Sequence, residues 1–197
     1  MPSLVPIVEG QSEVESVPIL FRRLLDDLGQ WGVLIAKPFR VKRTQVVREG
    51  ELERAVQQAV RARDDVAAAL VLLDADDDCP ARLGPELQER ARQAIAHLDV
   101  EVAVVLAQRE FECWLLAGKE SLRGVAGIRA DAVPPRDPER VRDGKGRLSE
   151  NMEGRRYLAV DDQSALVAQV DLEPVRNRCP SFDKLLREFH RLVEDIT

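Results

Sequence analysis

The sequence is poor in the residues on which several common kinds of site depend. Its three cysteines, Cys79, Cys113 and Cys179, are widely spaced and form no CxxC pair, so a secreted disulfide framework is not expected. Only two histidines are present, His97 and His190, and both lie in helical patterns, which argues against a histidine-centred metal cluster. Aromatic residues make up 4% of the chain, too few to predict an aromatic-rich platform for stacking bases.

Long apolar runs and the familiar nucleotide-binding loops are also absent. No segment approaches the roughly 20 apolar residues of a membrane span, and the first residues form no basic and apolar leader. Together with the cysteine usage, these absences predict a cytoplasmic protein that does not enter a membrane. The chain has no GxxxxGK(S/T), GxGxxG or GxSxG motif, so ATP or NAD binding through those loops and serine-hydrolase chemistry are not expected.

The apolar pattern of the 197 residues is that of an α/β protein. Four short apolar runs are typical of strands and lie at residues 4–8, 32–36, 66–73 and 100–107. Three segments with helical spacing lie between or beside them, at residues 17–28, 51–63 and 85–97. The alternation predicts a Rossmann-like, mainly parallel sheet with helices on both faces. Pro6 favours an outer position for the first strand or a place among the first residues of the strand, and Pro18 places the start of the first helix at Glu15 or Ser16.

The pattern divides the chain into three parts. Residues 1–118 are predicted to form the α/β core. Residues 119–160, rich in proline, glycine and charge, are predicted to form a loop-rich basic insertion. Residues 161–197 are predicted to form a C-terminal helical extension that packs on the core, with one helix at 162–176 and a last helix capped at Ser181.

Acidic residues follow three of the four predicted strands. They are Glu9 and Glu13 after the first strand, Asp74 and Asp76 after the third, and Glu110 and Glu112 after the fourth. The carboxyl ends of parallel strands share one edge of the sheet, where the ligands of open α/β sheets bind. We therefore expect Glu9, Asp74 and Asp76 to converge there, with Glu110 as a further candidate.

Convergence of carboxylates has an energetic consequence. Two carboxylates about 4 Å apart repel by roughly 4 kcal/mol at an effective dielectric constant near 20, so either one takes up a proton or a cation lies between them. Oxygen ligands without histidine or cysteine favour Mg²⁺ or Mn²⁺, ions that act on phosphate esters. The alternative is that each acid merely solvates a loop or caps the next helix, as the charge of Glu13 suits a first helical turn.

The acidic motifs carry a resemblance to known families. Residues 7–13, Ile-Val-Glu-Gly-Gln-Ser-Glu, and residues 72–76, Leu-Leu-Asp-Ala-Asp, look like the glutamate and DxD motifs of Toprim domains, which occur in topoisomerases, bacterial primases and overcoming-lysogenization-defect (OLD) nucleases. More closely, the chain resembles the bacterial family called domain of unknown function 4276. That family shares the Val-Glu-Gly start, the acidic motif, a Glu-Phe-Glu stretch as at 110–112 and a Cys-Pro-x-Phe stretch as at 179–182.

The resemblance implies a Toprim-like fold and a role for each matching position. Glu9 would be a general acid or base and a metal ligand, with Glu13 as a second catalytic candidate. The metal ligands would be Glu9, Asp74, Asp76, Glu110 and Glu112, and the cofactor Mg²⁺ or Mn²⁺. The family commonly has a lysine soon after a tyrosine near the site, whereas here Tyr157 is followed by Leu158. Neighbouring ATPase genes in the family imply an ATPase partner.

Basic residues cluster in two places. Lys37 and Arg40 follow the second predicted strand and belong on the same edge as the acids, and Lys145, Arg155 and Arg156 lie in the insertion. We assign these five residues to phosphate binding, because guanidinium groups beside a metal centre suit a phosphodiester. The alternative is a solvated surface held by salt bridges.

The leading functional hypothesis is a divalent-metal-dependent nuclease, or a related phosphoryl-transfer enzyme, that acts on nucleic acid. DNA is favoured over RNA, an ATPase partner in a bacterial defence-type system is implied, and a homodimer is left open. The second hypothesis is a non-catalytic Toprim-like regulatory or interaction subunit. The third is a haloacid-dehalogenase-like phosphatase, which is disfavoured because the DxD motif follows the third strand and Asp78 replaces the expected threonine or valine.

Overall fold

A parallel β-sheet forms the centre of the computed structural model, which describes residues 1–197. The strands are β1 (Ser3–Val8), β2 (Leu34–Ile35), β3 (Phe39–Arg40), β4 (Val66–Asp74) and β5 (Glu101–Ala107). Their order is β2-β1-β4-β5, with β3 also paired to β1, and every pairing is parallel. The predicted mainly parallel sheet is therefore confirmed.

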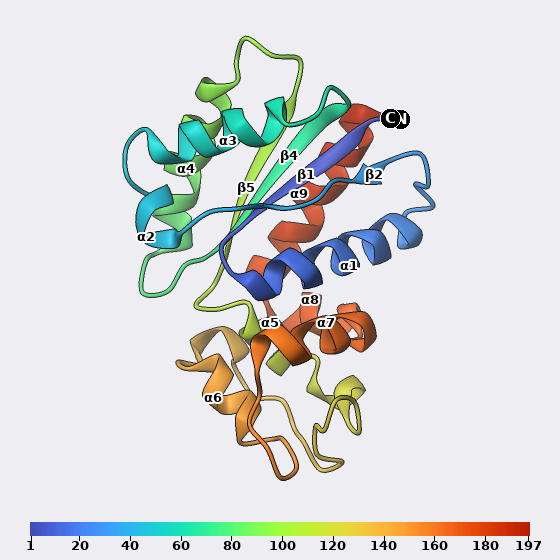
Figure 1. The fold of residues 1–197 in the computed structure, drawn as a ribbon. Coiled ribbons are helices and arrows are strands. Elements are labelled where there is room, and N and C mark those ends of the chain that lie inside the picture. Colours follow the sequence, from blue (N-terminus) through green and yellow to red (C-terminus); the bar gives the residue numbers. More distant parts are fainter.

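Helices cover both faces of the sheet, as predicted (Figure 1). The covering helices are α1 (Gln11–Asp27) and α9 (Pro180–Ile196) on one face and α3 (Glu51–Arg61) and α4 (Pro80–Ala94) on the other. Side chains of β4 alternate between the two cores: Leu70 and Leu72 belong to the first, and Val71 and Leu73 to the second. Both faces of β4 are thus buried, which explains its nearly continuous apolar sequence.

Strand β1 is central rather than at the edge, so the outer position expected from Pro6 is wrong. The backbone N–H and C=O groups of the even-numbered residues of β1 face β2 and β3. There the carbonyls of Leu4 and Val8 accept hydrogen bonds from the N–H groups of Ala36 and Val41 at 2.9 and 2.8 Å. Pro6 lies between these two bonds, opposite the gap between β2 and β3. Its missing N–H group therefore costs no hydrogen bond of the ladder.

The remaining elements are short and lie mostly beyond the carboxyl edge of the sheet, in the lower part of Figure 1. They are α2 (Arg43–Val46), α5 (Glu112–Ala117), the 3₁₀ helices η1 (Lys119–Leu122) and η2 (Pro138–Arg140), α6 (Gly144–Ser149), α7 (Ala159–Gln169) and α8 (Leu172–Arg178). Helix α7 packs along α1, and α9 packs on β5. The three-part division of the chain stays a prediction.

Three predicted helix starts need correction. Helix α4 begins at Pro80, five residues before the predicted start at residue 85, because proline suits the first turn of a helix. Helix α1 begins at Gln11, not at Glu15 or Ser16, because the Glu13 carboxylate accepts a hydrogen bond from the backbone N–H of Gly10 and so caps the first turn. Pro18 consequently lies inside the helix. The last helix is capped at Cys179, not at Ser181.

The predicted helix at 162–176 is two helices, α7 and α8. They separate at Val170 because Asp171 caps the second helix, its Oδ1 accepting a hydrogen bond from the N–H of Glu173 at 3.1 Å. Ser181 has a different use: its hydroxyl oxygen accepts a hydrogen bond from the indole N–H of Trp114 at 2.9 Å. This bond joins α9 to α5.

Candidate active site at the carboxyl edge of the sheet

The three predicted acidic motifs lie at one edge of the sheet. Glu9 directly follows β1, and Asp74 is the last residue of β4, paired with Ala107 at the end of β5. The neighbouring loops stay paired beyond the strands, since the N–H of Asp76 donates to the carbonyl of Arg109 at 2.9 Å. Both of these residues have positive φ, 51° and 68°. Such left-handed conformations are strained for residues with side chains and occur often at functional sites.

Glu9 is half-buried, and its Oε2 atom is buried without a hydrogen-bond partner. Burial raises the pKa of Glu9 to about 7, with Asp76 and Glu13 adding to the rise and Arg43 opposing it. A carboxyl group with this pKa can both give and take a proton near neutral pH.

Asp74 and Glu112 form the deeper part of the site. Asp74 Oδ1 accepts a hydrogen bond from the N–H of Phe111 at 2.8 Å. Its pKa is nevertheless raised well above its usual range, first by burial and then by the charges of Glu112, Glu13 and Glu9. Glu112 is 1% exposed, and its Oε2 also has no partner. Burial raises the pKa of Glu112 as well.

Glu13 completes what we call the acid cluster, defined as Glu9, Glu13, Asp74 and Glu112. Its carboxylate caps α1 through Gly10, yet burial raises its pKa. The capping bond gives Glu13 a structural task, and its predicted catalytic role stays a prediction. The cluster is short of positive charge, because few cations face its four carboxylates, and the charge of Glu13 raises the pKa of Glu9, Asp74 and Glu112.

Lys145 is one of those few cations. Its Nζ lies 3.8 Å from Glu112 Oε1, and although burial opposes the change, Glu112, Asp74, Glu110 and Glu13 raise the pKa of Lys145. Helix α6 can approach this closely because Gly144 has no side chain: a Cβ there would lie 2.9 Å from the Cβ of Glu112.

Two further residues of the site had no role assigned to them from the sequence. Arg43 is 8% exposed; its Nε donates to the carbonyl of Asp74 at 2.9 Å, and it pairs with Asp78 at 2.5 Å. Arg43 thereby fixes the loop after β4. The hydroxyl of Tyr157 donates to Glu112 Oε1 at 3.4 Å. In the sequence, Arg43 is one of the basic residues after the second predicted strand that were expected on the same edge as the acids, and Tyr157 marks the departure from the family's tyrosine–lysine spacing.

The other predicted phosphate-binding residues divide into two sets. Arg40 lies beside Val8 in β3 and donates to Gln11 Oε1 at 2.8 Å, and Lys37 is exposed just before β3. Arg155 is bound instead to the buried Asp162, with N···O distances of 2.6 and 2.8 Å, and Arg156 is exposed beside it. The contact gives Arg155 a structural role, and phosphate binding by Arg155 and Arg156 stays a prediction.

The structure contains no ready-made metal cage: no three Asp, Glu, His or Cys side chains form a group that could hold a metal ion. Two of the predicted ligands lie outside the acid cluster: Asp76 is exposed and Glu110 is half-buried. The donor chemistry does suit a hard divalent cation, because the unpartnered oxygens of Glu9 and Glu112 and the mutual repulsion of the carboxylates would all be relieved by one. Metal ligation by the five predicted acids therefore stays a prediction.

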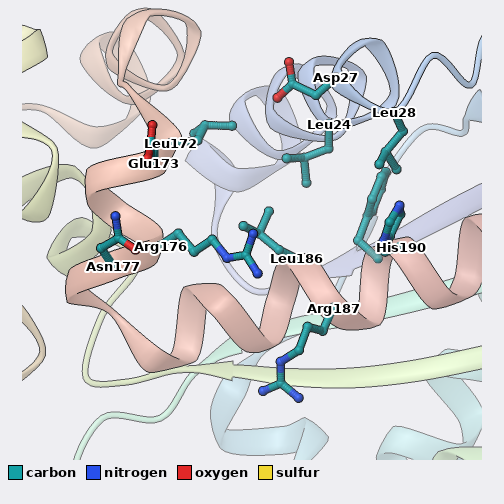
Figure 2. A pocket seen from close by; sticks show the side chains of 11 residues that line it. Leu24, Asp27, Leu28, Leu172, Glu173, Arg176, Asn177, Leu186, Arg187 and His190 are labelled. Atoms are coloured by element: carbon teal, nitrogen blue, oxygen red, sulfur yellow. The ribbon is translucent and has the colours of Figure 1, made fainter.

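A cleft of about 600 Å³ lies elsewhere, between α1, α8 and α9 (Figure 2). Leu24, Leu28, Leu186 and Phe189 form its apolar part, with Arg176, Arg187 and His190 around it. Glu13 is 11 residues before Leu24 in α1, which is about 16 Å along the helix axis. The cleft is therefore separate from the acid cluster.

Comparisons with known proteins give one family and two solved structures. The model of the family described as "Domain of unknown function (DUF4276)" matches residues 8–190. Two structures of the C-terminal region of the Xanthomonas campestris pv. campestris OLD protein, phased with iodine and with platinum, are 18% identical to the chain, with TM-scores of 0.43 and 0.41. The matches cover 95% and 96% of this chain and 97% and 96% of those chains. These TM-scores are too low to carry an inference.

No curated protein matches the chain. None of its helices combines the length and the apolar character needed to cross a membrane.

Proposed function

The chain belongs to the family described as domain of unknown function (DUF4276), and from that premise we propose that the acid cluster is the active centre of a divalent-metal-dependent phosphodiesterase that cleaves nucleic acid. Family membership confirms the prediction made from the four ordered motifs. The nuclease function, the metal and the DNA substrate are proposals supported by the chemistry of the site.

The state of Glu9 carries the proposal. One of its oxygens is buried without a partner, and its pKa is raised to about 7. Near neutral pH, both protonation states of Glu9 are therefore populated. This suits a group that takes a proton from the attacking water or gives one to the leaving oxygen.

The remaining residues support that chemistry in different ways. Asp74 and Glu112 would hold Mg²⁺ or Mn²⁺, which supplies charge neutralisation of the scissile phosphate, while Glu9 stays free for proton transfer. Lys145 lies beside Glu112 and offers an exposed ammonium to a phosphate oxygen. Arg43 holds the backbone of Asp74 and opposes the rise in the pKa of Glu9, so it positions the loop and adjusts the proton affinity of Glu9.

One observation favours the second candidate, a non-catalytic interaction subunit: the acids do not form a ready metal-binding group. The gathering of four carboxylates, with the pKa of each raised by burial, favours the enzyme, because a docking surface gains nothing from burying them. The proposed ATPase partner and a homodimer follow from the resemblance alone. A haloacid-dehalogenase phosphatase is not favoured, since Asp78 is used in the ion pair with Arg43.

Cleavage of plasmid and single-stranded DNA in Mn²⁺ tests the proposal. Glu9→Gln is nearly isosteric and removes the proton-transfer group, so cleavage is expected to fall about 10²–10⁴-fold. Asp74→Ala is expected to abolish Mn²⁺-dependent cleavage. The matched control is Glu49→Gln, which alters an exposed glutamate in the loop before α3.

The control is expected to cleave like the wild type. Wild-type protein that stays inactive in Mn²⁺, alone and with a candidate ATPase, would replace the enzyme proposal with the interaction-subunit proposal. Equal cleavage by Glu9→Gln and wild type would remove Glu9 from the mechanism.

A further inference from the structure

Two adjoining clefts beside α2 and α3 have the opposite charge balance from the chain as a whole. One, of about 360 Å³, lies between β3, α2 and the start of α3, and the other, of about 370 Å³, lies over the second half of α3. Arg54 and Gln58 line both, so the two clefts adjoin. The chain has 35 acidic and 29 basic residues, yet Glu51 is the one acid that lines these clefts.

The positive residues form a stripe that leads away from the acid cluster. Arg54, Gln58 and Arg61 are exposed and are separated by four and three residues in α3, so they lie along one side of the helix. The stripe covers about 10 Å of helix from Arg54 to Arg61. Arg40 and Lys42 extend it to the carboxyl edge, because Arg40 is paired with Val8, the residue before Glu9.

Most of these positive side chains have no acidic partner. Arg40 donates to the neutral Gln11, and Arg61 contacts His97 Nε2 at 3.4 Å. Arg54 pairs with Glu51 within its own helix. Phe39 is half-buried in the first cleft, beside Arg40. A basic groove with an aromatic side chain is the chemistry that binds a single nucleic-acid strand, through its phosphates and one stacked base.

We propose that Arg40, Lys42, Arg54 and Arg61 form a track for the backbone of a single nucleic-acid strand that enters or leaves the acid cluster. The inference rests on the proposed function, because the track has a purpose only if the substrate is a strand longer than the site. It adds a binding surface on α3 and a path for the substrate: along the outer side of α3 and past β3 to Glu9.

The test is a binding measurement that needs no cleavage. A fluorescein-labelled 30-nucleotide single-stranded DNA is titrated in EDTA with wild type and with Arg54→Gln/Arg61→Gln, over a series of NaCl concentrations, by fluorescence anisotropy. Each lost phosphate contact lowers the slope of log Kd against log[NaCl] by about 0.7 for a single strand, so the double variant is expected to lose about 1.4. If the plots of wild type and double variant meet at 1 M NaCl, the affinity of the double variant at 0.1 M NaCl is about 25-fold lower than that of the wild type.

Arg176→Gln/Arg187→Gln is the matched control. It also removes two positive charges from exposed arginines, but on α8 and α9, and α9 covers the other face of the sheet. Its salt dependence is expected to equal that of the wild type. Circular dichroism and a melting curve establish that both variants are folded.

Two results would overturn the track. One is a salt dependence of Arg54→Gln/Arg61→Gln equal to that of the control. The other is competition by poly-L-glutamate as strong as that by unlabelled oligonucleotide of equal charge, which would assign the surface to an acidic protein. Because no cleavage is measured, an inactive wild type would contradict the proposed function but leave this binding result intact.

Discussion

Two buried carboxylates in this chain are held in opposite ways. Asp162 is 4% exposed and accepts hydrogen bonds from both terminal guanidinium nitrogens of Arg155 and, at 2.8 Å, from the N–H of Leu158. Glu112 is 1% exposed, has one oxygen without a partner, and lies 3.8 Å from its nearest cation, Lys145. Burial acts to raise both pKa values, but Arg155 holds the pKa of Asp162 below its usual range, whereas that of Glu112 stays raised.

The difference shows that the missing charge at the sheet edge is a local property. Glu120 is held in the same way as Asp162, because Arg178 donates two hydrogen bonds to it, of 2.7 and 2.8 Å. The acid cluster instead gathers four carboxylates beside Lys145 and Arg43. In an apo protein such an arrangement is destabilising, and this is the physical ground for expecting a bound cation to complete it.

Removing the paired acid should have the larger effect on stability. Asp162→Ala is expected to lower the free energy of unfolding at pH 7 by about 2 kcal/mol, because charged hydrogen bonds are lost and the N–H of Leu158 loses its partner. Urea unfolding measures the change. The control is Asp161→Ala, which alters the exposed aspartate directly before Asp162. Its free energy of unfolding is expected to stay within about 0.5 kcal/mol of that of the wild type.

The effect of Asp162→Ala should depend on pH with a definite sign. A carboxyl group whose folded pKa is lowered stabilises the protein above its unfolded pKa, about 3.9. The stabilisation is lost as the pH falls through the lower, folded value. The gap between wild type and Asp162→Ala is therefore expected to be constant from pH 5 to 8 and to shrink below pH 4; a gap that widens in acid would contradict the assigned ion pair.

Removing the charge of Glu112 should change stability by a smaller amount and in the opposite direction. Glu112→Gln is expected to raise the free energy of unfolding at pH 8 in EDTA by about 1 kcal/mol, because it removes a charge that burial disfavours and that the neighbouring carboxylates repel. A carboxyl group whose pKa is raised by folding destabilises the folded protein fully above its folded pKa and not at all below its unfolded pKa. The stability gained in Glu112→Gln should therefore vanish near pH 4.

Glu120→Gln is the control for Glu112→Gln, because it removes the charge of a glutamate that is paired with Arg178. It is expected to lower stability at pH 8 by less than about 1 kcal/mol. Loss of stability in Glu112→Gln at pH 8 as well would show that the Glu112 charge is compensated and would remove the contrast between the two kinds of acid.

The sequence predicted those parts of the site that depend on strand topology. The apolar runs that became β1, β4 and β5 placed Glu9 and Asp74 at one edge, because parallel strands must end together. The buried environment of Glu112 was not predictable in this way, since it arises from α6 and Tyr157 folding over α5.

Residues 119–160 show why the rest could not be predicted. The segment has no apolar period, so nothing in the sequence indicated that Gly144 lets Lys145 approach Glu112. Likewise, Arg155 and Lys145 are both basic residues in the same segment, yet one is held by Asp162 and the other lies at the acids. Composition cannot distinguish the roles of these two residues, because tertiary contacts determine which acid each of them meets.

Calorimetric titration of Mn²⁺ at pH 7, in two buffers of different ionisation enthalpy, tests the central claim that a cation completes the acid cluster. Because the carboxyls are partly protonated before the ion binds, with the pKa of Glu9 raised to about 7, binding should release protons and the measured heat should differ between the buffers. Asp74→Asn should remove the saturable heat. Equal binding by Asp74→Asn and wild type, or a heat that is the same in both buffers, would contradict the account.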